Sequence, residues 1–195
     1  MPRRITALWL PHLAAERHVR ALGTVTAPLA VVAELQGALR LASLTASAEV
    51  AGLSRGMALA DARAICPALL TRPAEPAQEA AFLAALRRWA LRYSPWVAAD
   101  GAEALVLDIT GCAHLFGGEA AMLAEMQDRL ARNGLTARLA CADTRGAAWA
   151  LTRFGTAPPA ASPPNRALAK ALTAGPDDGA GSQPPVANAL AVDAP

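Results

Sequence analysis

An apolar run near the N-terminus, Ile5 to Leu10, is followed at once by Pro11. A short continuous run of this kind is typical of a strand buried on both faces. Proline has no N–H to donate, so the pairing of this strand is expected to stop there. The chain therefore begins with a buried strand that leads into a helix.

The rest of the pattern alternates short strands with helices. We predict helices at 14–21, 47–51, 57–65, around 82–93, at 118–133 and from about 144 to 154, and strands at 28–33, 38–44, 69–72, 96–99, 104–110 and 136–141. Asp100-Gly101 is a strong signal for a hairpin between two of these strands. This order predicts an α+β fold in which a smaller unit interrupts the main domain.

Composition limits the function only weakly. The formal net charge of +2 neither demands nor excludes a nucleic-acid partner. The cysteines Cys66, Cys112 and Cys141 are far apart and lack the spacing of a metal site, which indicates unpaired thiols in a reducing cytoplasm. No apolar segment reaches the length of about 20 residues that spans a bilayer, so we expect no membrane association.

The segment from Tyr93 to Gly118, YSPWVAADGAEALVLDITGCAHLFGG, carries the most specific motif. It resembles the second carboxylate motif of Y-family translesion DNA polymerases, which are the DinB- and UmuC-like enzymes. LDITG at 107–111 matches the end of that motif, and GCAHLFGGE with the later ADTRGAAWALTRFG is similar to the ImuB branch of the family. The resemblance implies a Y-family palm, a ferredoxin-like antiparallel sheet with helices, interrupted by a small fingers domain.

The resemblance also implies where catalytic carboxylates would lie. Nucleotidyl transfer uses two Mg²⁺ ions held by acidic side chains. The positions that carry metal ligands in active relatives correspond here to Trp9 and Pro11 in the first strand, and to Glu103 and Ala104 in the second motif. Trp9 offers no oxygen, and a single carboxylate cannot hold two divalent ions. We therefore predict no catalytic residues, no metal and no cofactor.

The residues that contact the triphosphate in active relatives are also replaced. GLSRGM at 52–57 matches the family, but the expected Tyr and Arg before it correspond to Ala46 and Glu49. A phosphate-seeking lysine corresponds to Trp149, and Arg145 alone keeps a positive charge in that element. A glutamate facing a triphosphate would repel it by a few kcal/mol, on the order expected in a partly desolvated pocket.

These losses predict a protein that is not an enzyme, a scaffold or adaptor in damage-induced mutagenesis and translesion synthesis. The resemblance implies DNA, an error-prone replicative polymerase, a RecA-like accessory protein and the sliding clamp as partners, met through regions beyond this chain. We expect a palm at 1–22 and 73–156, a fingers-like insertion at 23–72, and a Pro/Ala/Gly-rich linker toward a thumb at 157–195.

Two alternatives stay open. The first is an active error-prone polymerase that needs Mg²⁺ and has a displaced metal set, formed by Asp100, Glu103 and Asp108. The second is a ferredoxin-like interaction module unrelated to DNA. Three groups of residues each have two interpretations. Arg87, Arg88 and Arg92 could contact DNA or form a solvated helix face, and the tryptophans could anchor the core or stack on bases. The histidines could be structural residues or ligands.

Overall fold

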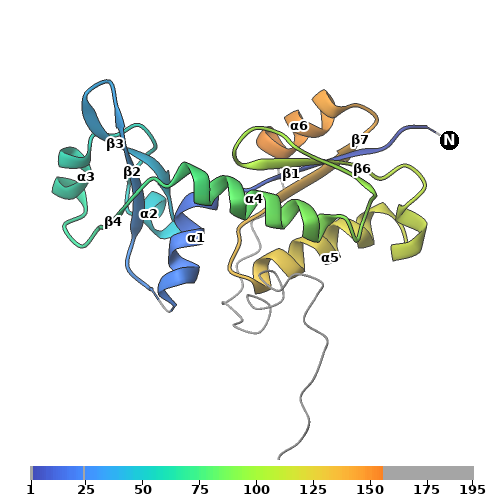
Figure 1. Cartoon of the computed structure of the whole chain (residues 1–195), viewed down its shortest axis with the longest axis horizontal. Coiled ribbons are helices and arrows are strands. Elements are labelled where there is room, and N and C mark those ends of the chain that lie inside the picture. Colours follow the sequence, from blue (N-terminus) through green and yellow to red (C-terminus); the bar gives the residue numbers. More distant parts are fainter. Residues whose placement is uncertain (1, 24, 156–195) are drawn as a thin grey trace, which may run out of the picture.

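The computed structural model describes residues 2–23 and 25–155 and shows two sheets with their helices (Figure 1). The strands are β1 (Ile5–Trp9), β2 (Leu29–Leu35), β3 (Ala38–Leu44), β4 (Leu70–Pro73), β5 (Trp96–Ala99), β6 (Ala104–Asp108) and β7 (Arg138–Ala142). The helices are α1 (Leu13–Leu22), α2 (Ala46–Val50), α3 (Leu59–Ile65), α4 (Pro76–Ala90), η1 (Ala113–Phe116), α5 (Glu119–Arg132) and α6 (Arg145–Phe154). The predicted α+β class is confirmed.

Sheet A has four strands in the order β5-β6-β1-β7. Strand β1 pairs antiparallel with β6 on one side and with β7 on the other, and its first four residues are buried, as the apolar run predicts. In the register of these ladders, Trp9 lies opposite Ala104 of β6 and Arg138 of β7. The end of β1 therefore meets the start of β6.

Helices cover sheet A on both faces. Leu8 of β1 belongs to the main core, which it shares with Leu86 of α4 and Met122 of α5. Ile5 and Ala7 belong instead to a smaller cluster with Ala148 of α6. Because side chains alternate along a strand, Trp9 lies on the same face as these two residues, toward α6. In Figure 1, α6 and α5 lie on opposite sides of the sheet.

Sheet B has three strands in the order β3-β2-β4, with β2 antiparallel to β3 and parallel to β4. Its separate core includes Leu41 and Leu44 of β3 and residues from α2 and α3, such as Ala48 and Ala62. We call β2, β3, β4, α2 and α3 together the sheet B lobe. The domain boundaries inferred from the resemblance stay predictions, and the predicted linker at 157–195 lies outside the described residues.

Helix α1 lies between the two sheets. Its Ala15 packs against Leu29 and Val31 of sheet B. Its Glu16 carboxylate accepts hydrogen bonds of 3.0 and 2.9 Å from the backbone N–H of Thr136, just before β7. Helix α1 therefore links sheet B to sheet A.

Local signals place several element ends. Gly101 has a φ of +73°, which suits glycine and allows the tight connection between β5 and β6. The Thr144 hydroxyl accepts a 3.2 Å hydrogen bond from Ala147 N and so caps α6. The helical turn η1 was not predicted, since its four residues are too few to show a period. Within 2–23 and 25–155, none of the helices has the length and apolarity to cross a membrane.

Candidate functional site

The residues that correspond to the family's metal positions come together at one end of sheet A. Trp9 and Ala104 are register partners, and the N–H of Leu10 donates a 2.9 Å hydrogen bond to the carbonyl of Glu103. Pro11 follows directly at the turn into α1. We call this end, where β1 stops and β6 starts, the Trp9 end.

Two arginine guanidinium groups lie close to the ring of Trp9. The Arg153 guanidinium carbon lies 4.7 Å from the centre of the Trp9 ring, and that of Arg138 lies 5.9 Å from it. Arg153 also lies 4.4 Å from the centre of the Trp149 ring. The Arg153 guanidinium therefore contacts the rings of both Trp9 and Trp149, two positions predicted from the sequence to be degenerate. Each such contact stabilises by about 0.5–2 kcal/mol, depending on desolvation.

The Glu103 carboxylate is engaged by an arginine of the sheet B lobe. Arg55 Nη1 lies 2.8 Å from Glu103 Oε1, and Arg55 Nη2 donates to the carbonyl of Pro11. The Trp9 indole N–H adds a long hydrogen bond of 3.4 Å to Glu103 Oε2. The Glu103 carboxylate and the Pro11 carbonyl therefore both bind the guanidinium of Arg55.

The remaining predicted positions near this end are also paired or exposed. Arg145, at the start of α6, forms an ion pair with Asp100 in the hairpin turn. Glu49 Oε2 lies 3.8 Å from Nε2 of the buried His12, while Ala46 is exposed. Burial lowers the pKa of His12, and the nearby Glu49 carboxylate opposes that shift. Arg145, the residual nucleotide-binding candidate predicted from the sequence, is thus paired with a carboxylate of the same chain.

The Mg²⁺ implied by the resemblance does not fit these residues. Mg²⁺ prefers an octahedral set of oxygen ligands, but Glu103 and the Pro11 carbonyl are bonded to Arg55. Arg138 and Arg153 add positive charge beside Trp9, which opposes a divalent cation. Within the described ranges 2–23 and 25–155, no group of three or more His, Cys, Asp or Glu residues could hold a metal.

Asp108, a member of the displaced metal set, lies at the other end of β6. Its register partners are Ile5 of β1 and Trp96 of β5. It accepts hydrogen bonds of 3.2 Å from Arg3 and 3.1 Å from the N–H of Thr110. The Thr110 hydrogen bond, with help from Arg3, lowers the pKa of Asp108. The structure thus separates Asp108 from Asp100 and Glu103.

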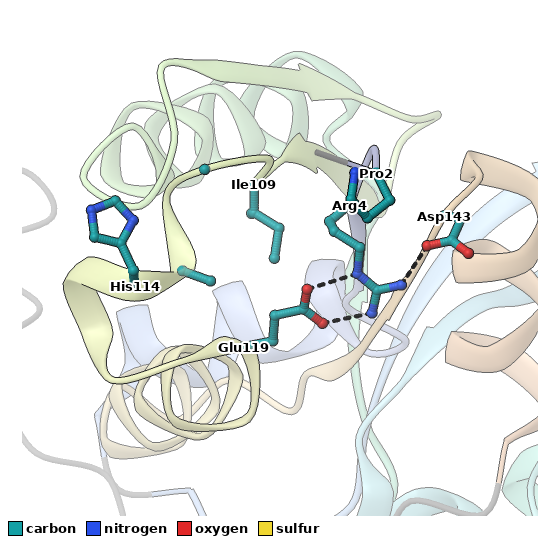
Figure 2. A pocket seen from close by; sticks show the side chains of 8 residues that line it. Pro2, Arg4, Ile109, His114, Glu119 and Asp143 are labelled. Atoms are coloured by element: carbon teal, nitrogen blue, oxygen red, sulfur yellow. Dashed lines mark hydrogen bonds and ion pairs between the residues drawn. The ribbon is translucent and has the colours of Figure 1, made fainter.

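A cavity of about 520 Å³ lies at this second end of sheet A, which we call the Arg4 end (Figure 2). Arg4 precedes β1 and contacts both Glu119 oxygens, at 2.7 and 2.6 Å, and one Asp143 oxygen at 2.6 Å. The hydrogen bond from Arg4 is the main cause of a lowered pKa for Glu119. Figure 2 shows both carboxylates turned toward the one guanidinium.

The structure shows how exposed the arginines and tryptophans with two interpretations are. Arg87, Arg88 and Arg92 are exposed, and Arg92 folds back onto the carbonyl of Trp89 at 3.1 Å. Trp89 is a core anchor as predicted, at 6% exposure. Trp96 and Trp149 are 74% and 38% exposed, so the core interpretation is wrong for them. Scarcity of aromatic residues does not fix which face of an element they occupy.

Sequence reasoning missed Arg55, Arg138 and Arg153 as parts of the site. Arg153 follows Trp149 by four residues in a predicted helix, so helical spacing could have placed them together. Arg55 lies 48 residues from Glu103 and in another sheet's lobe. Its role is visible only in the tertiary structure.

Comparison with known proteins finds a matching family, similar curated proteins and similar solved structures. A family model described as the impB/mucB/samB family matches residues 14–153. Two curated proteins named Protein ImuB, from Caulobacter vibrioides strains NA1000 / CB15N and ATCC 19089 / CIP 103742 / CB 15, are each 57% identical over 104 residues. That stretch covers 53% of this chain and 23% of each relative, so the chain spans only a fraction of their length.

Solved structures show the same fold at low sequence identity. An insertion ternary complex of Dbh DNA polymerase matches with a TM-score of 0.66 and 15% identity, over 77% of this chain and 45% of that one. DinB from Sulfolobus solfataricus matches with a TM-score of 0.64 and 17% identity, over the same 77% and 45%. These likenesses establish the architecture, a Y-family polymerase fold, and not the activity.

Proposed function

The chain belongs to the impB/mucB/samB family, and we propose that within it this protein is a non-catalytic polymerase homologue that serves as a scaffold or adaptor. The resemblance to Y-family polymerases and to their ImuB branch is confirmed by the family match and by the 57% identity to Protein ImuB. Family membership argues against an unrelated interaction module. The choice between an inactive and an active homologue depends on the Trp9 end.

The observation that carries the proposal is the pairing of Arg55 with Glu103 and the Pro11 carbonyl. Two-metal chemistry requires several anionic oxygens converging on two ions. Here a tryptophan and an alanine stand at two of the positions, and the remaining carboxylate neutralises an arginine. The reaction would have to displace this arginine and still lack ligands for a second ion.

The nucleotide side supports the same proposal. At the position of Trp149, active relatives carry a lysine that meets the phosphates. The Trp149 ring instead contacts Arg153, which also contacts Trp9. Glu49 brings negative charge near His12, 3.8 Å away. An incoming triphosphate would meet the additional carboxylate of Glu49 and would lack the lysine that Trp149 replaces. Both changes make the electrostatic energy of triphosphate binding less favourable.

The proposed role is in damage-induced mutagenesis and translesion synthesis, in the cytoplasm. The family resemblance supports DNA, an error-prone replicative polymerase, a RecA-like accessory protein and the sliding clamp as partners. Arg87 and Arg88 are exposed on α4 and are our candidates for DNA contacts within this chain, with Arg92 beside them. The chain spans a fraction of its relatives, so the main partner contacts are proposed for the longer protein.

Primer extension by the full-length protein tests the proposal. We expect no template-dependent incorporation with Mg²⁺ or Mn²⁺, while an active Y-family polymerase extends the same primer in parallel. The matched variant is Glu103→Ala, which removes the surviving carboxylate. Incorporation by the wild-type protein that Glu103→Ala abolishes would establish the active-polymerase alternative instead.

A binding measurement complements this assay. Calorimetric titration of the protein with Mg²⁺ and a deoxynucleoside triphosphate should show no saturable binding. Trp149→Lys restores the charge expected at that position and serves as the comparison variant. Tight binding of the triphosphate to the wild-type protein would contradict the nucleotide part of the proposal.

A further inference from the structure

Arg55 crosses from one lobe of the molecule to the other. Its backbone belongs to the turn that follows α2, and this turn is held on sheet B by hydrogen bonds between Gly56 N and Leu41 O, at 2.8 Å, and between Leu41 N and Met57 O, at 3.0 Å. Its side chain leaves the lobe and reaches the Trp9 end of sheet A. The residue is thus anchored at both ends.

The guanidinium meets two oxygens from different segments. One is the Glu103 carboxylate at the start of β6, at 2.8 Å, and the other is the Pro11 carbonyl between β1 and α1. The planar fork of arginine suits such a pair of acceptors, and its charge persists at every ordinary pH. The side chains of Arg55 and Glu103 are only 37% and 28% exposed, so solvent screens the pair partly.

We propose that Arg55 is a built-in cation that clamps the sheet B lobe onto sheet A, so that the arrangement of the two needs neither a divalent ion nor a nucleotide. This inference rests on the proposed loss of catalysis, because an active site would need the same oxygens for metal. A guanidinium on the chain is always present at the site, whereas an ion or nucleotide must bind from solution.

Other contacts join the sheet B lobe to α1 and to the residue before it. Ser43 of β3 accepts a 3.4 Å hydrogen bond from the N–H of Ala15, and Glu49 of α2 lies 3.8 Å from His12. Glu75, just before α4, forms an ion pair with Arg17 of α1. These contacts do not involve Arg55. Removing the clamp should therefore loosen the Trp9 end alone, while the core of each sheet stays folded.

Hydrogen–deuterium exchange of the full chain, resolved by peptide, tests the clamp. The comparison includes the wild type, Arg55→Ala, Arg55→Lys and Glu103→Gln. The control is Arg63→Ala, which removes an exposed arginine of α3 in the same lobe. Each protein is measured with MgCl₂ and with EDTA.

We expect Arg55→Ala to speed exchange around 52–57 and 10–12 by about threefold to tenfold, the range of a partly screened charged pair with a second hydrogen bond. Glu103→Gln should do the same to a smaller extent, Arg55→Lys should lie between wild type and Arg55→Ala, and Arg63→Ala should match wild type. Wild-type exchange should be equal in MgCl₂ and in EDTA.

Two results would overturn the inference. One is equal exchange in Arg55→Ala and wild type at both segments. The other is a change at these segments when Mg²⁺ is added to wild type, which would mean that an ion displaces the arginine. Global exchange in Arg55→Ala would show unfolding, and Glu103→Gln then decides the question. A protein that fails this test and yet extends no primer would leave the proposed function standing.

Discussion

The two ends of sheet A use arginine–carboxylate pairs in opposite ways. At the Arg4 end, Arg4 joins its own segment before β1 to two others by binding Glu119 of α5 and Asp143 after β7. At the Trp9 end, Arg55 comes from the sheet B lobe to bind Glu103. The first end ties sheet A to its own helix and loop, and the second ties it to another lobe.

The motif at 107–111 and the pair Trp9–Ala104 lie at opposite ends of the β1–β6 ladder. Asp108 accepts hydrogen bonds from Arg3 and Thr110, so it holds the end of β6 in place. Trp9 and Ala104 lie at the opposite end of the same ladder, and neither side chain carries a carboxylate. Four predictions test this contrast, from the largest effect to the smallest.

The largest effect on the free energy of unfolding is expected at Glu16, a carboxylate that lies at neither the Trp9 end nor the Arg4 end. Burial raises the pKa of Glu16 to about 7 from 4.5, against the hydrogen bonds from Thr136. Between these values the folded state keeps a proton that the unfolded state releases, so the contribution of Glu16 to wild-type stability falls as pH rises from about 4.5 to about 7. We expect Glu16→Gln, which cannot ionise, to be more stable than wild type by up to about 3 kcal/mol near pH 8 and about equal near pH 4.

Chemical denaturation across this pH range measures the effect of Glu16→Gln. The exposed Glu34→Gln is the control, and it should follow the wild-type curve. A Glu16→Gln protein that is less stable than wild type near pH 8 would mean that the charged carboxylate is needed there. A buried carboxylate without an arginine partner would then stabilise the fold, as the arginine-paired carboxylates at the two ends of sheet A do.

Truncating Trp9 tests whether the Trp9 end has become structural. Trp9→Ala removes the ring that contacts Arg153 and Arg138 and the long hydrogen bond to Glu103. We expect a loss of about 2 kcal/mol in the free energy of unfolding, less than for a fully buried tryptophan. Trp96→Ala, at a ring that is 74% exposed, should cost under about 0.5 kcal/mol. Equal losses for the two would break the contrast.

Removing one charge tests the Arg4 end. The pKa of Glu119 is held below its ordinary 4.5, chiefly by the hydrogen bond from Arg4. Its stabilising contribution is therefore present above about pH 4.5 and is lost as pH falls through the lowered pKa. Glu119→Gln should cost about 0.5–1 kcal/mol at neutral pH, because the side chain is partly solvated.

Thermal unfolding at neutral and acidic pH measures this change. The gap between wild type and Glu119→Gln should close in acid, where the wild-type carboxyl is protonated. Asp128→Asn breaks an i,i+4 pair on the surface of α5 and should have a smaller effect at neutral pH. A gap that widens in acid would contradict the assignment.

The smallest effect is expected at Arg145. This residue pairs with Asp100 but is 67% exposed, and it begins α6. A positive charge at a helix N-terminus is unfavourable to the helix dipole, which offsets the ion pair. We expect Arg145→Ala to change the free energy of unfolding by no more than about 0.5 kcal/mol in urea denaturation. A loss above about 1 kcal/mol would show that the hairpin turn depends on this pair.

Much of the fold could be predicted because its signals are local. Pro11 and the Asp100–Gly101 turn marked where β1 ends and where the β5–β6 hairpin bends. The helix predicted at 118–133 is present as α5, and its Met122 and Met126 lie four residues apart in the main core. The exposure of Trp96 and Trp149 could not be predicted, because it depends on what packs over each strand or helix.

The sequence by itself determined that the side chains of Trp9 and Ala104 offer no oxygen ligand, whatever the fold. The tertiary structure alone decided which groups lie beside these two residues. Only the packing of the sheet B lobe against sheet A brings Arg55 to Glu103, across 48 residues of sequence. Side-chain identity fixes which atoms exist, but their distances depend on contacts between segments that no local pattern encodes.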